Sequence, residues 1–502
     1  MSTECETIYI NTKNIPAIQD KLTLAKNREQ FYQNDDLVSI FVLCYNRIDK
    51  TKQCVNSIIK YTDKIRYHLY LVDNGSTDGT VEFFETVPYK YKSILKISDN
   101  KCCAFALNTA MKLCSSKYIV TVTNDVVVTT NWLTNLIVCI ESDERIGYVV
   151  PMSSNVSNLQ ELGLKFSSIE EMQIKALKYN KSDPSKWQER LRLINIVAVF
   201  RKEVVDLAGV FDLGFLHDFG EDDLSIRIRR AGYKLVLAGD TFIHHNHDFR
   251  NLEDKDPIEF QNSLEAGRKA YKDKYFGLDA WDDINNYEQS MIYMLSKKKI
   301  FKNDSSVLGI NVKCGTPLLQ IRNLIRANGI SSCNLFAYTV EAKYYYDLQC
   351  VTNGNVYCDH IEFINKYYKP ESFDFIVLGE PVNTFTEPVR IAENILSLVK
   401  KGGSVLLKLR NTSSVYTLLN MVEVNESGDG DMPVQITFED FYSCLRLMGA
   451  SKINVMRENF QVNDDILKEL KNAMQTFSIC KNVQDSVDKL NTKDYIFHIE
   501  KL

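Results

Sequence analysis

No stretch of the 502-residue sequence is apolar over the length needed to span a bilayer, and the polar N-terminus lacks the apolar core of a signal peptide. None of the 13 cysteines forms a CxxC pair, a common framework of structural zinc sites. Cys44, Cys54, Cys114 and Cys139 lie within apolar patterns, as buried free thiols do. The sequence therefore predicts a cytoplasmic protein with reduced cysteines, no transmembrane segment and no structural zinc.

The sequence is also poor in net charge and in residues that break regular structure. A formal charge of -5 gives no bulk attraction to nucleic acid, so we expect no nucleic-acid partner. With 10 prolines, 21 glycines and 45% hydrophobic residues, the composition is that of a globular protein. Because 502 residues exceed one ordinary hydrophobic core, two or three domains are expected.

Apolar runs alternate with helical patterns from residue 38 onward. This alternation predicts an α/β protein with a parallel, doubly wound sheet. Strand patterns cover residues 38–43, 69–72, 94–97, 118–122 and 195–200, with closing strands at 235–237 and 242–243, and helical patterns cover 50–61, 81–85, 105–113 and 224–231. The expected division is a lead-in segment at 1–36, a first α/β domain at 37–255, a helical linker at 256–304 and a second α/β domain at 305–502.

The turn at residues 72–80 follows the apolar run 69–72 and is the most informative segment of the sequence. Asp73 ends the run, and a Ser/Thr/Asp cluster then precedes the next helical pattern. In an open α/β sheet, ligands bind at the carboxyl ends of the strands, where Asp73 would accept hydrogen bonds from a base or ribose. A capped strand-to-helix turn without a ligand is an equally good interpretation of this segment alone.

Three further polar clusters lie at predicted strand ends or in adjoining loops. Each has a structural explanation by itself, such as a capped turn, carboxylates at a helix N-terminus or a solvated loop. If they converge, a carboxylate and a histidine would form a site for Mg²⁺ or Mn²⁺, and a separate carboxylate would deprotonate an acceptor hydroxyl. The clusters are Cys44 to Arg47, Thr123 to Asp125, and Gly220 to Asp223 with the histidines of residues 244–247.

Residues 38 to about 250 resemble the family-2 glycosyltransferases of GT-A fold, which are inverting enzymes that use nucleotide sugars. The motifs occur in the family's order. They are Tyr45-Asn46-Arg47, the turn at 72–80, Asn100 with Phe105-Ala106 and Asn108, Asn124-Asp125, Trp132-Leu133, the strand at 147–151, the acidic motif before Arg227, and the closing histidines.

The resemblance implies a role for each matching position. Asp125 would be the last acid of the DxD motif and hold Mn²⁺ or Mg²⁺ with His244, although His245 or His247 could take that place. The catalytic base would be Glu221 by its spacing from Arg227, or Asp222 by the Glu-Asp letters of the motif. The nucleotide sugar would be contacted by Tyr45, Asn46, Arg47, Asp73, Asn74, Asn100, Asn108 and Asn124.

Two positions depart from the family's pattern. Thr123 replaces the first acid or amide of the DxD motif, so only Asp125 would bring charge to the metal. Lys101-Cys102-Cys103-Ala104 replaces a short glycine step, which would reshape the loop beside the donor. Neither departure removes the expected base.

Residues 306–502 resemble a class I S-adenosylmethionine methyltransferase, which has a Rossmann-like fold. The segment 373–380 is similar to its fourth strand, residues 388–407 to the following helix, glycine turn and fifth strand, and 437–449 to its late helix before the last hairpin. Glu341 stands where an acid would bind the cofactor ribose.

The cofactor loop of this second domain is degenerate. Only Gly315 remains of the GxGxG turn, because Lys313 replaces the first glycine and Pro317 the last. Asn383-Thr384-Phe385 also stands where active relatives often carry an acid and a histidine. We therefore expect no S-adenosylmethionine, and a domain used for dimerisation, acceptor docking or stability.

The resemblance as a whole implies an inverting glycosyltransferase that uses a UDP-sugar, with N-acetylglucosamine or a hexose as the transferred sugar. Its acceptor would be a hydroxyl of a bacterial surface glycan or of a protein such as flagellin. Two alternatives remain: a bifunctional glycosyltransferase and methyltransferase, and a non-catalytic scaffold of two degenerate domains.

Overall fold

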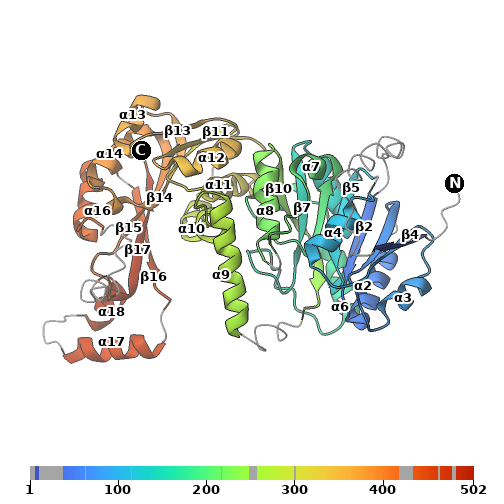
Figure 1. Cartoon of the computed structure of the whole chain (residues 1–502). Helices are drawn as coiled ribbons and strands as arrows, with labels where there is room; N and C mark the ends of the chain where they lie inside the picture. The colour runs from blue at the N-terminus through green and yellow to red at the C-terminus, as the bar shows by residue number, and fades with distance from the viewer. Residues whose placement is uncertain are drawn as a thin grey trace. The chain divides into compact units, whose positions relative to one another are not determined.

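The computed structural model shows two compact units, Met1–Asn285 and Asn286–Leu502 (Figure 1). Among the described residues, no helix is both long and apolar enough to cross a membrane. Of the segment expected as a linker, α9 (Pro257–Lys274) and η2 (Ala280–Ile284) belong to the first unit and α10 (Gln289–Ser296) to the second. The structure describes residues 6–10, 38–62, 64–114, 116–215, 218–247, 257–298, 301–415, 417, 433–450, 452–461, 464–476 and 482–501.

The described part of the first unit is built on a ten-stranded sheet with the order β1-β4-β3-β2-β5-β9-β7-β10-β6, and β8 pairs with β10. β1, β4, β3, β2 and β5 are parallel, which confirms the α/β class expected from the alternating pattern. The strands are β1 (Glu6–Ile10), β2 (Val38–Cys44), β3 (Tyr67–Asp73), β4 (Lys92–Ile97), β5 (Tyr118–Thr123), β6 (Val126–Val127), β7 (Ile146–Ser153), β8 (Trp187–Arg190), β9 (Val197–Arg201) and β10 (Lys234–His245).

Helices cover both faces of this sheet, so the central strands are apolar on both sides. Ile40 and Val42 of β2 pack with α2, α3 and α5, whereas Phe41 and Leu43 pack with α4, α7 and α8. The four cysteines expected inside the core are free and buried, which confirms that prediction. The helices are α2 (Ile48–Tyr61), α3 (Thr80–Thr86), α4 (Cys103–Met111), α5 (Trp132–Glu141), α6 (Ile169–Tyr179), η1 (Pro184–Lys186), α7 (Lys202–Ala208) and α8 (Gly220–Arg230).

The register of the parallel strands aligns their carboxyl ends. Cys44 at the end of β2 lies opposite Asp73 at the end of β3, and Leu43 lies opposite Thr123 at the end of β5. The polar residues that follow these strands therefore meet at one edge of the sheet.

The long strand β10 closes the sheet where the sequence suggested two short strands. Its pairing with β7 shifts register between Ala238 and Phe242, which are opposite Pro151 and Met152. Two separate apolar runs thus belong to one irregular strand. The last residues of β10 pair antiparallel with β6, with His245 opposite Val126. This pairing places the closing histidines beside the segment that follows β5.

The described part of the second unit has a seven-stranded sheet with the order β13-β12-β11-β14-β15-β17-β16. Its first five strands are parallel and follow the 3-2-1-4-5 order of a doubly wound fold, while β17 and β16 are antiparallel. The expected Rossmann-like class and the final hairpin are confirmed. The strands are β11 (Ser305–Ile310), β12 (Cys333–Thr339), β13 (Val356–Cys358), β14 (Phe373–Pro381), β15 (Val399–Arg410), β16 (Lys452–Asn459) and β17 (Thr492–Glu500).

Helices of the second unit connect these strands. α14 and α16 contribute Ile391, Ile395 and Phe441 to an apolar cluster with β14, β15 and β17. A helical pair, α17 and α18, interrupts the hairpin between β16 and β17. The elements are α11 (Thr316–Ala327), η3 (Ala342–Tyr344), α12 (Tyr345–Thr352), η4 (Ile361–Phe363), α13 (Ile364–Tyr367), η5 (Val382–Thr384), α14 (Pro388–Leu398), α16 (Phe438–Leu447), α17 (Asp464–Thr476) and α18 (Val483–Asn491).

Candidate active site

The turn after β3 is held by its own carboxylates. Asp78 accepts hydrogen bonds from the backbone N–H of Ile48 at 2.8 Å and from the Thr80 hydroxyl at 2.6 Å, which joins the starts of α2 and α3. Asp73 accepts from the backbone N–H of Ser76 at 3.1 Å, and burial raises the pKa of its carboxyl group. Gly75 has a φ of +83°, and a Cβ there would lie 2.6 Å from the Asn100 nitrogen. The turn is therefore a tightly built capping structure that also carries a buried carboxyl group at the strand end.

The turn after β2 passes through two consecutive left-handed residues, Asn46 with φ +52° and Arg47 with φ +61°. Asn124 supports it, because its Nδ2 donates to the Asn46 carbonyl at 3.1 Å and to the Thr51 hydroxyl at 2.9 Å. The Asn46 side chain accepts from the Thr77 N–H at 2.9 Å. These amides join three strand ends, and the exposed ring of Tyr45 remains available to a ligand.

The three other asparagines expected at the nucleotide site have different surroundings. Asn74 Nδ2 donates to Asn100 Oδ1 at 2.9 Å, so the two residues connect the turns after β3 and β4. Asn108 is buried, and both ends of its amide bind the backbone of Phe211, at 2.7 and 3.0 Å. The structure thus differs from the expectation for Asn108, because its hydrogen-bonding groups anchor the loop before α8.

Asp125 is the centre of a cluster of three metal-ligand side chains. Its Oδ2 lies 3.4 Å from His245 Nε2 and 3.3 Å from His247 Nδ1, and the three potential ligand atoms lie within 4.8 Å of one another. Thr123, which occupies the first position of the DxD motif, donates to Asp125 Oδ1 at 2.9 Å. Thr123 thus orients Asp125 through a hydrogen bond. In the family's pattern an acid or amide at this position would be a further ligand of the metal.

His244 faces away from this cluster. Its Nδ1 lies 2.6 Å from the Ser154 hydroxyl, and its ring packs edge-on against Phe166 at 5.0 Å between ring centroids. The reason is the alternation of an extended chain, in which residues 245 and 247 share one side and residue 244 points to the other. Of the three histidines considered from the sequence, the structure brings His245 and His247, and not His244, to Asp125.

The donor set fits a divalent cation. His245 Nδ1 lies 3.0 Å from the Asn155 carbonyl oxygen, which can only accept a hydrogen bond, so Nδ1 is the donor to it and Nε2 is the nitrogen that faces Asp125 and would bind a cation. Although burial opposes ionisation, His245 holds the pKa of the Asp125 carboxyl well below its usual range. An ionised carboxylate and two ring nitrogens at these separations form a compact oxygen and nitrogen ligand set.

The acidic motif opens α8, and its three carboxylates have three different surroundings. Asp222 is buried and accepts from Nε and Nη2 of Arg192. Asp223 is fully buried and accepts from Arg227 at 2.7 and 2.9 Å, from the Tyr275 hydroxyl at 2.6 Å, and from Lys274. Both of these acids are therefore engaged in structural ion pairs.

Glu221 is the carboxylate of the motif that suits proton transfer. Burial, together with the negative charge of Asp222, raises the pKa of Glu221 to about 7. Burial is the main cause of the raised pKa of the Cys103 thiol at the start of α4. Cys102 raises this pKa as well, and so does the negative charge of Glu221. Glu221 therefore lies near the loop that follows β4, at the same edge of the sheet as Asp73 and Asp125.

Two supporting residues were not found by the sequence analysis. Arg192 lies in an irregular loop, and no motif indicates its ion pair with Asp222. Lys50, in the first turn of α2, donates to the Asn246 carbonyl between the two cluster histidines. The spacing His245-x-His247 was a signal that could have identified the ligand pair, since alternate residues of an extended segment share a side.

The edge of the second sheet where a cofactor would bind is polar but altered. Asn311, Lys313 and Gly315 all have positive φ, at +47°, +51° and +105°. The loop backbone therefore has the left-handed conformation that favours glycine even at Asn311 and Lys313, which carry side chains. Asn311 Nδ2 donates to Glu380 at 3.2 Å, and Glu341 pairs with Lys343 at 3.4 Å.

Asn383, at the position where active relatives often carry an acid, has no exposed surface. Its Nδ2 donates to the carbonyls of Arg410 and Val434, and its Oδ1 accepts from the Arg410 N–H. The side chain is therefore part of the framework of the second unit.

Comparison with known proteins gives one match in sequence and several in structure. The model of glycosyl transferase family 2 matches residues 39–206, about a third of the chain. Among curated proteins, none matches the sequence.

The similar solved structures include glycosyltransferases and methyltransferases. One is the mannosyltransferase PcManGT from Pyrobaculum calidifontis in complex with GDP-Man and Mn²⁺, 17% identical, with a TM-score of 0.36 and coverage of 61% of this chain and 82% of that one. GalNAc-T7 with UDP, GalNAc and Mn²⁺ is 10% identical, with a TM-score of 0.38 and coverage of 66% and 65%. A SAM-dependent methyltransferase from Archaeoglobus fulgidus is 14% identical, with a TM-score of 0.30 and coverage of 46% and 99%. Likeness at this level does not establish a shared substrate.

The family match spans β2 to α7 and includes the turns that carry Asp73 and Asp125. The second sheet supplies the Rossmann-like strand order independently. The first unit therefore carries a domain that matches glycosyl transferase family 2 and has a GT-A-like fold, which supports a glycosyltransferase activity.

Proposed function

We propose that the chain transfers a sugar from a UDP-sugar to an acceptor hydroxyl with inversion at the anomeric carbon. The cluster of Asp125, His245 and His247 carries this proposal, because its ligand atoms lie together at the strand edge and Asp125 lies within the segment that the family model matches. Glu221, with its raised pKa, supplies a separate proton acceptor at the same edge.

Glu221 is the proposed base. An acceptor hydroxyl beside it gives up its proton as the oxygen attacks the anomeric carbon, and the sugar–phosphate bond breaks on the opposite side. A carboxylate with a pKa near 7 is matched to this role, because about half of it is ionised at neutral pH and it is still a useful proton acceptor. Asp222 is assigned a structural role, since Arg192 binds both of its oxygens.

Asp125, His245 and His247 would hold the divalent cation that neutralises the diphosphate leaving group. Two imidazoles in a set of three favour Mn²⁺ over Mg²⁺, because Mg²⁺ prefers oxygen ligands and retains water. The carbonyl of Asn155 fixes the ring of His245, and Thr123 fixes Asp125, so the ligands keep their orientation while the diphosphate exchanges.

Asp73 is the proposed contact to the nucleotide base. It is buried at the end of β3, and its turn is fixed by Gly75 and by the Asn74–Asn100 hydrogen bond. A raised pKa suits a carboxyl group that hydrogen-bonds to a uracil ring in a site of low polarity. The uracil N–H would be the donor to this carboxylate.

For the transferred sugar we propose N-acetylglucosamine or a hexose. For the acceptor we propose a hydroxyl of a bacterial surface glycan or of a protein such as flagellin. These finer assignments rest on the resemblance of the motifs.

A panel of UDP- and GDP-sugars assayed for hydrolysis, with and without Mn²⁺, tests the proposal. We expect release of UDP from one UDP-sugar, dependent on Mn²⁺ and lost in Asp125→Ala. Equal hydrolysis without metal and in Asp125→Ala would contradict the metal assignment. No hydrolysis of any donor would favour a non-catalytic scaffold.

A further inference from the structure

The strand β16 forms an open edge of the second sheet. It is the last strand in the sheet order, and within the described residues β17 is the one strand that pairs with it. Its outer side therefore presents backbone N–H and C=O groups that can pair with a further strand. The opposite edge of the sheet is β13, which has three residues and offers much less for pairing.

Most of the features that protect an edge strand from pairing are missing in β16. Proteins protect such strands by keeping them short or by placing proline, a bulge or a charged residue along them. β16 has eight residues and no proline, and its register with β17 is regular up to Glu458. Its charged residues, Lys452, Arg457 and Glu458, lie near the two ends. The middle of this edge, residues 453–456, carries no charge that would oppose pairing.

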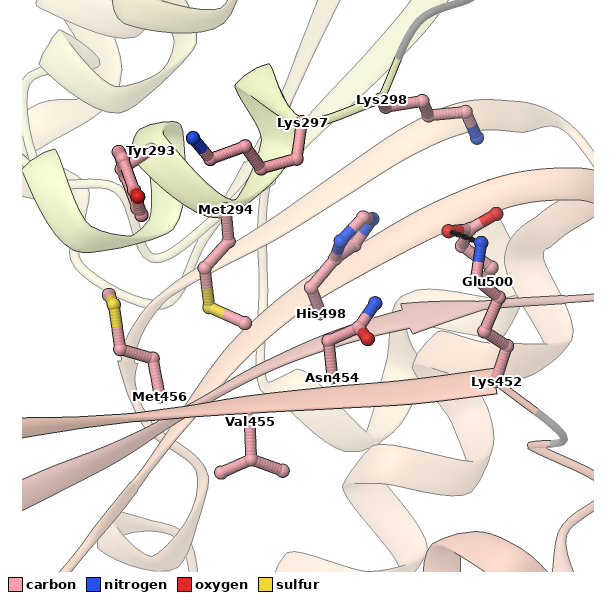
Figure 2. A pocket seen from close by; sticks show the side chains of 10 residues that line it. All are labelled: Tyr293, Met294, Lys297, Lys298, Lys452, Asn454, Val455, Met456, His498 and Glu500. Atoms are coloured by element: carbon pink, nitrogen blue, oxygen red, sulfur yellow. Dashed lines mark hydrogen bonds and ion pairs between the residues drawn. The ribbon is translucent and has the colours of Figure 1, made fainter.

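Both faces of β16 are accessible. Figure 2 shows Asn454 directed toward His498 and the pocket of about 740 Å³ beside α10, and Val455 directed to the opposite side of the strand. Val455 is apolar and 37% exposed. A β-branched side chain in the middle of an edge strand is suited to packing against a neighbouring strand.

The sequence of β16 is complementary to itself in one antiparallel register. A two-fold axis perpendicular to the sheet keeps every residue on its own face, so the allowed registers differ in steps of two residues. With the axis at Val455, Lys452 lies opposite Glu458 of the partner subunit, and Val455 lies opposite the partner's Val455. Symmetry repeats the Lys–Glu pair, so two pairs of opposite charge flank an apolar contact.

The neighbouring registers lack this complementarity. With the axis at Asn454, Lys452 lies opposite Met456 of the partner subunit. With the axis at Met456, Lys452 lies opposite Phe460 of the partner subunit, beyond the end of the strand. Neither of these registers places opposite charges across from each other, so the charges select the register centred on Val455.

Both members of the Lys–Glu pair can take a further partner. Lys452 pairs with Glu500 of β17 at 2.6 Å and keeps 56% of its side chain exposed. Glu458 accepts a hydrogen bond from the Ser290 hydroxyl at 3.0 Å, and within the described residues no cationic side chain pairs with it. A second copy would give Glu458 a cation and Lys452 a second carboxylate.

We propose that the chain forms a symmetric dimer in which β16 pairs antiparallel with β16 of a second copy, about a two-fold axis at Val455. Main-chain hydrogen bonds join the two seven-stranded sheets, and the Lys452–Glu458 pairs set the register. Because the axis preserves the faces of the sheet, α10 and the pocket beside it lie on the same face in both copies. The dimer does not depend on the proposed glycosyl transfer.

Sedimentation velocity of the full chain over a series of concentrations tests for the dimer. We expect a species of twice the monomer mass of 57.7 kDa. A monomer alone at every concentration up to the solubility limit would overturn the proposal.

Val455→Lys tests the surface. It places two lysines opposite each other at the axis and should dissociate the dimer, because like charges directly opposite are destabilising. Leu447→Lys is the matched control, since Leu447 at the end of α16 is 88% exposed and lies outside β16. This control should leave the dimer intact, and circular dichroism checks the folding of both variants. A dimer that persists in Val455→Lys, or that is lost equally in Leu447→Lys, would overturn the assignment to β16.

Charge reversal tests the register. Lys452→Glu and Glu458→Lys should each raise the Kd of the dimer about tenfold, because each turns two opposite-charge pairs into like-charge pairs. An equimolar mixture of the two variants restores opposite charges at both positions and should dimerise more tightly than either variant alone. A mixture that dimerises no better than the single variants would overturn the register, and this comparison also serves if Val455→Lys does not fold.

Discussion

Arg192 binds both carboxylate oxygens of Asp222, and no cationic side chain among the described residues is hydrogen-bonded to the neighbouring Glu221. The Glu-Asp pair of the acidic motif is thereby divided into an aspartate held by Arg192 and a glutamate with a raised pKa. Adjacent carboxylates in different environments are a common arrangement at sites of proton transfer.

The first prediction separates these two acids. Glu221→Gln should lower the turnover number by about 10²–10⁴-fold with little change in folding, because it removes the base and keeps the shape of the side chain. Asp222→Asn should instead lower stability, by up to about 3–5 kcal/mol for a fully buried pair, since Arg192 loses its charged partner. Turnover by UDP release and the midpoint of urea unfolding measure the two effects. Near-native turnover in both variants would show that neither residue is the base.

The second prediction concerns pH. The folded protein binds the Glu221 proton more tightly than the unfolded chain does, because its pKa is raised to about 7. The rate under kcat/KM conditions should therefore rise with pH through about 7. The free energy of unfolding should fall as pH rises from about 4.5 to about 7. Above that range the contribution of Glu221 to this free energy should stay constant. Glu221→Gln should remove this loss and gain stability relative to the native chain at pH 8 but not at pH 4. An equal effect at both pH values would contradict the raised pKa.

The third prediction tests the histidine assignment. His245→Ala and His247→Ala should each weaken Mn²⁺ binding about tenfold or more, since each removes one of three protein ligands. His244→Ala should leave Mn²⁺ affinity within about twofold and lower the melting temperature, because it breaks the buried contact with Ser154. Titration of Mn²⁺ followed by electron paramagnetic resonance measures the affinity without any turnover. Loss of Mn²⁺ binding in His244→Ala alone would restore the ligand set expected from the family's pattern.

The fourth prediction concerns Asn108. Asn108→Ala should lower the free energy of unfolding by about 2 kcal/mol or more, because two buried hydrogen bonds to Phe211 are lost. The KM for the donor should change little if the amide only anchors the loop. Asn100→Ala is a suitable comparison, since Asn100 is exposed at the donor edge. A raised KM in Asn108→Ala without loss of stability would indicate a nucleotide contact instead.

The fifth prediction concerns the second unit. Millimolar S-adenosylmethionine should not raise the melting temperature, because Lys313 occupies a position where the fold normally has glycine for close approach to the ligand. A stabilisation that disappears in Glu341→Ala would instead support the bifunctional alternative.

Much of the fold was predictable from the sequence because the central strands are buried on both faces. Residues 38–43 and 118–122 are apolar except for Ser39 and Thr121 and lack a regular polar alternation, which distinguishes parallel central strands from surface ones. The continuity of β10 was not predictable, because Gly239-Asp240-Thr241 interrupts its apolar run with residues typical of a turn. Asp240 is nevertheless fully buried and accepts a hydrogen bond from the Trp187 ring N–H at 2.7 Å. That contact depends on a residue more than fifty positions away.

The site was less predictable than the fold. Asp125 and Glu221 stand in motifs, so the sequence alone identifies them as candidates. The choice among the three histidines depends on which way each side chain points, and that depends on the pairing of β10. The role of Arg192 could not be predicted from the sequence, because an ion pair between residues thirty positions apart leaves no local pattern.

The irregularity between Ala238 and Phe242 decides which histidine meets Asp125. Between these two positions β10 runs on by four residues while β7 runs on by one, so β10 contains three residues that have no partner in β7. Three is odd, and an odd insertion reverses the facing of every residue after it. Deleting one of these residues would turn His244 toward Asp125 and send its neighbours into the contact with Ser154 and Phe166. The length of the segment 239–241 thus sets which side chains face Asp125, in addition to the buried contacts that its own residues make.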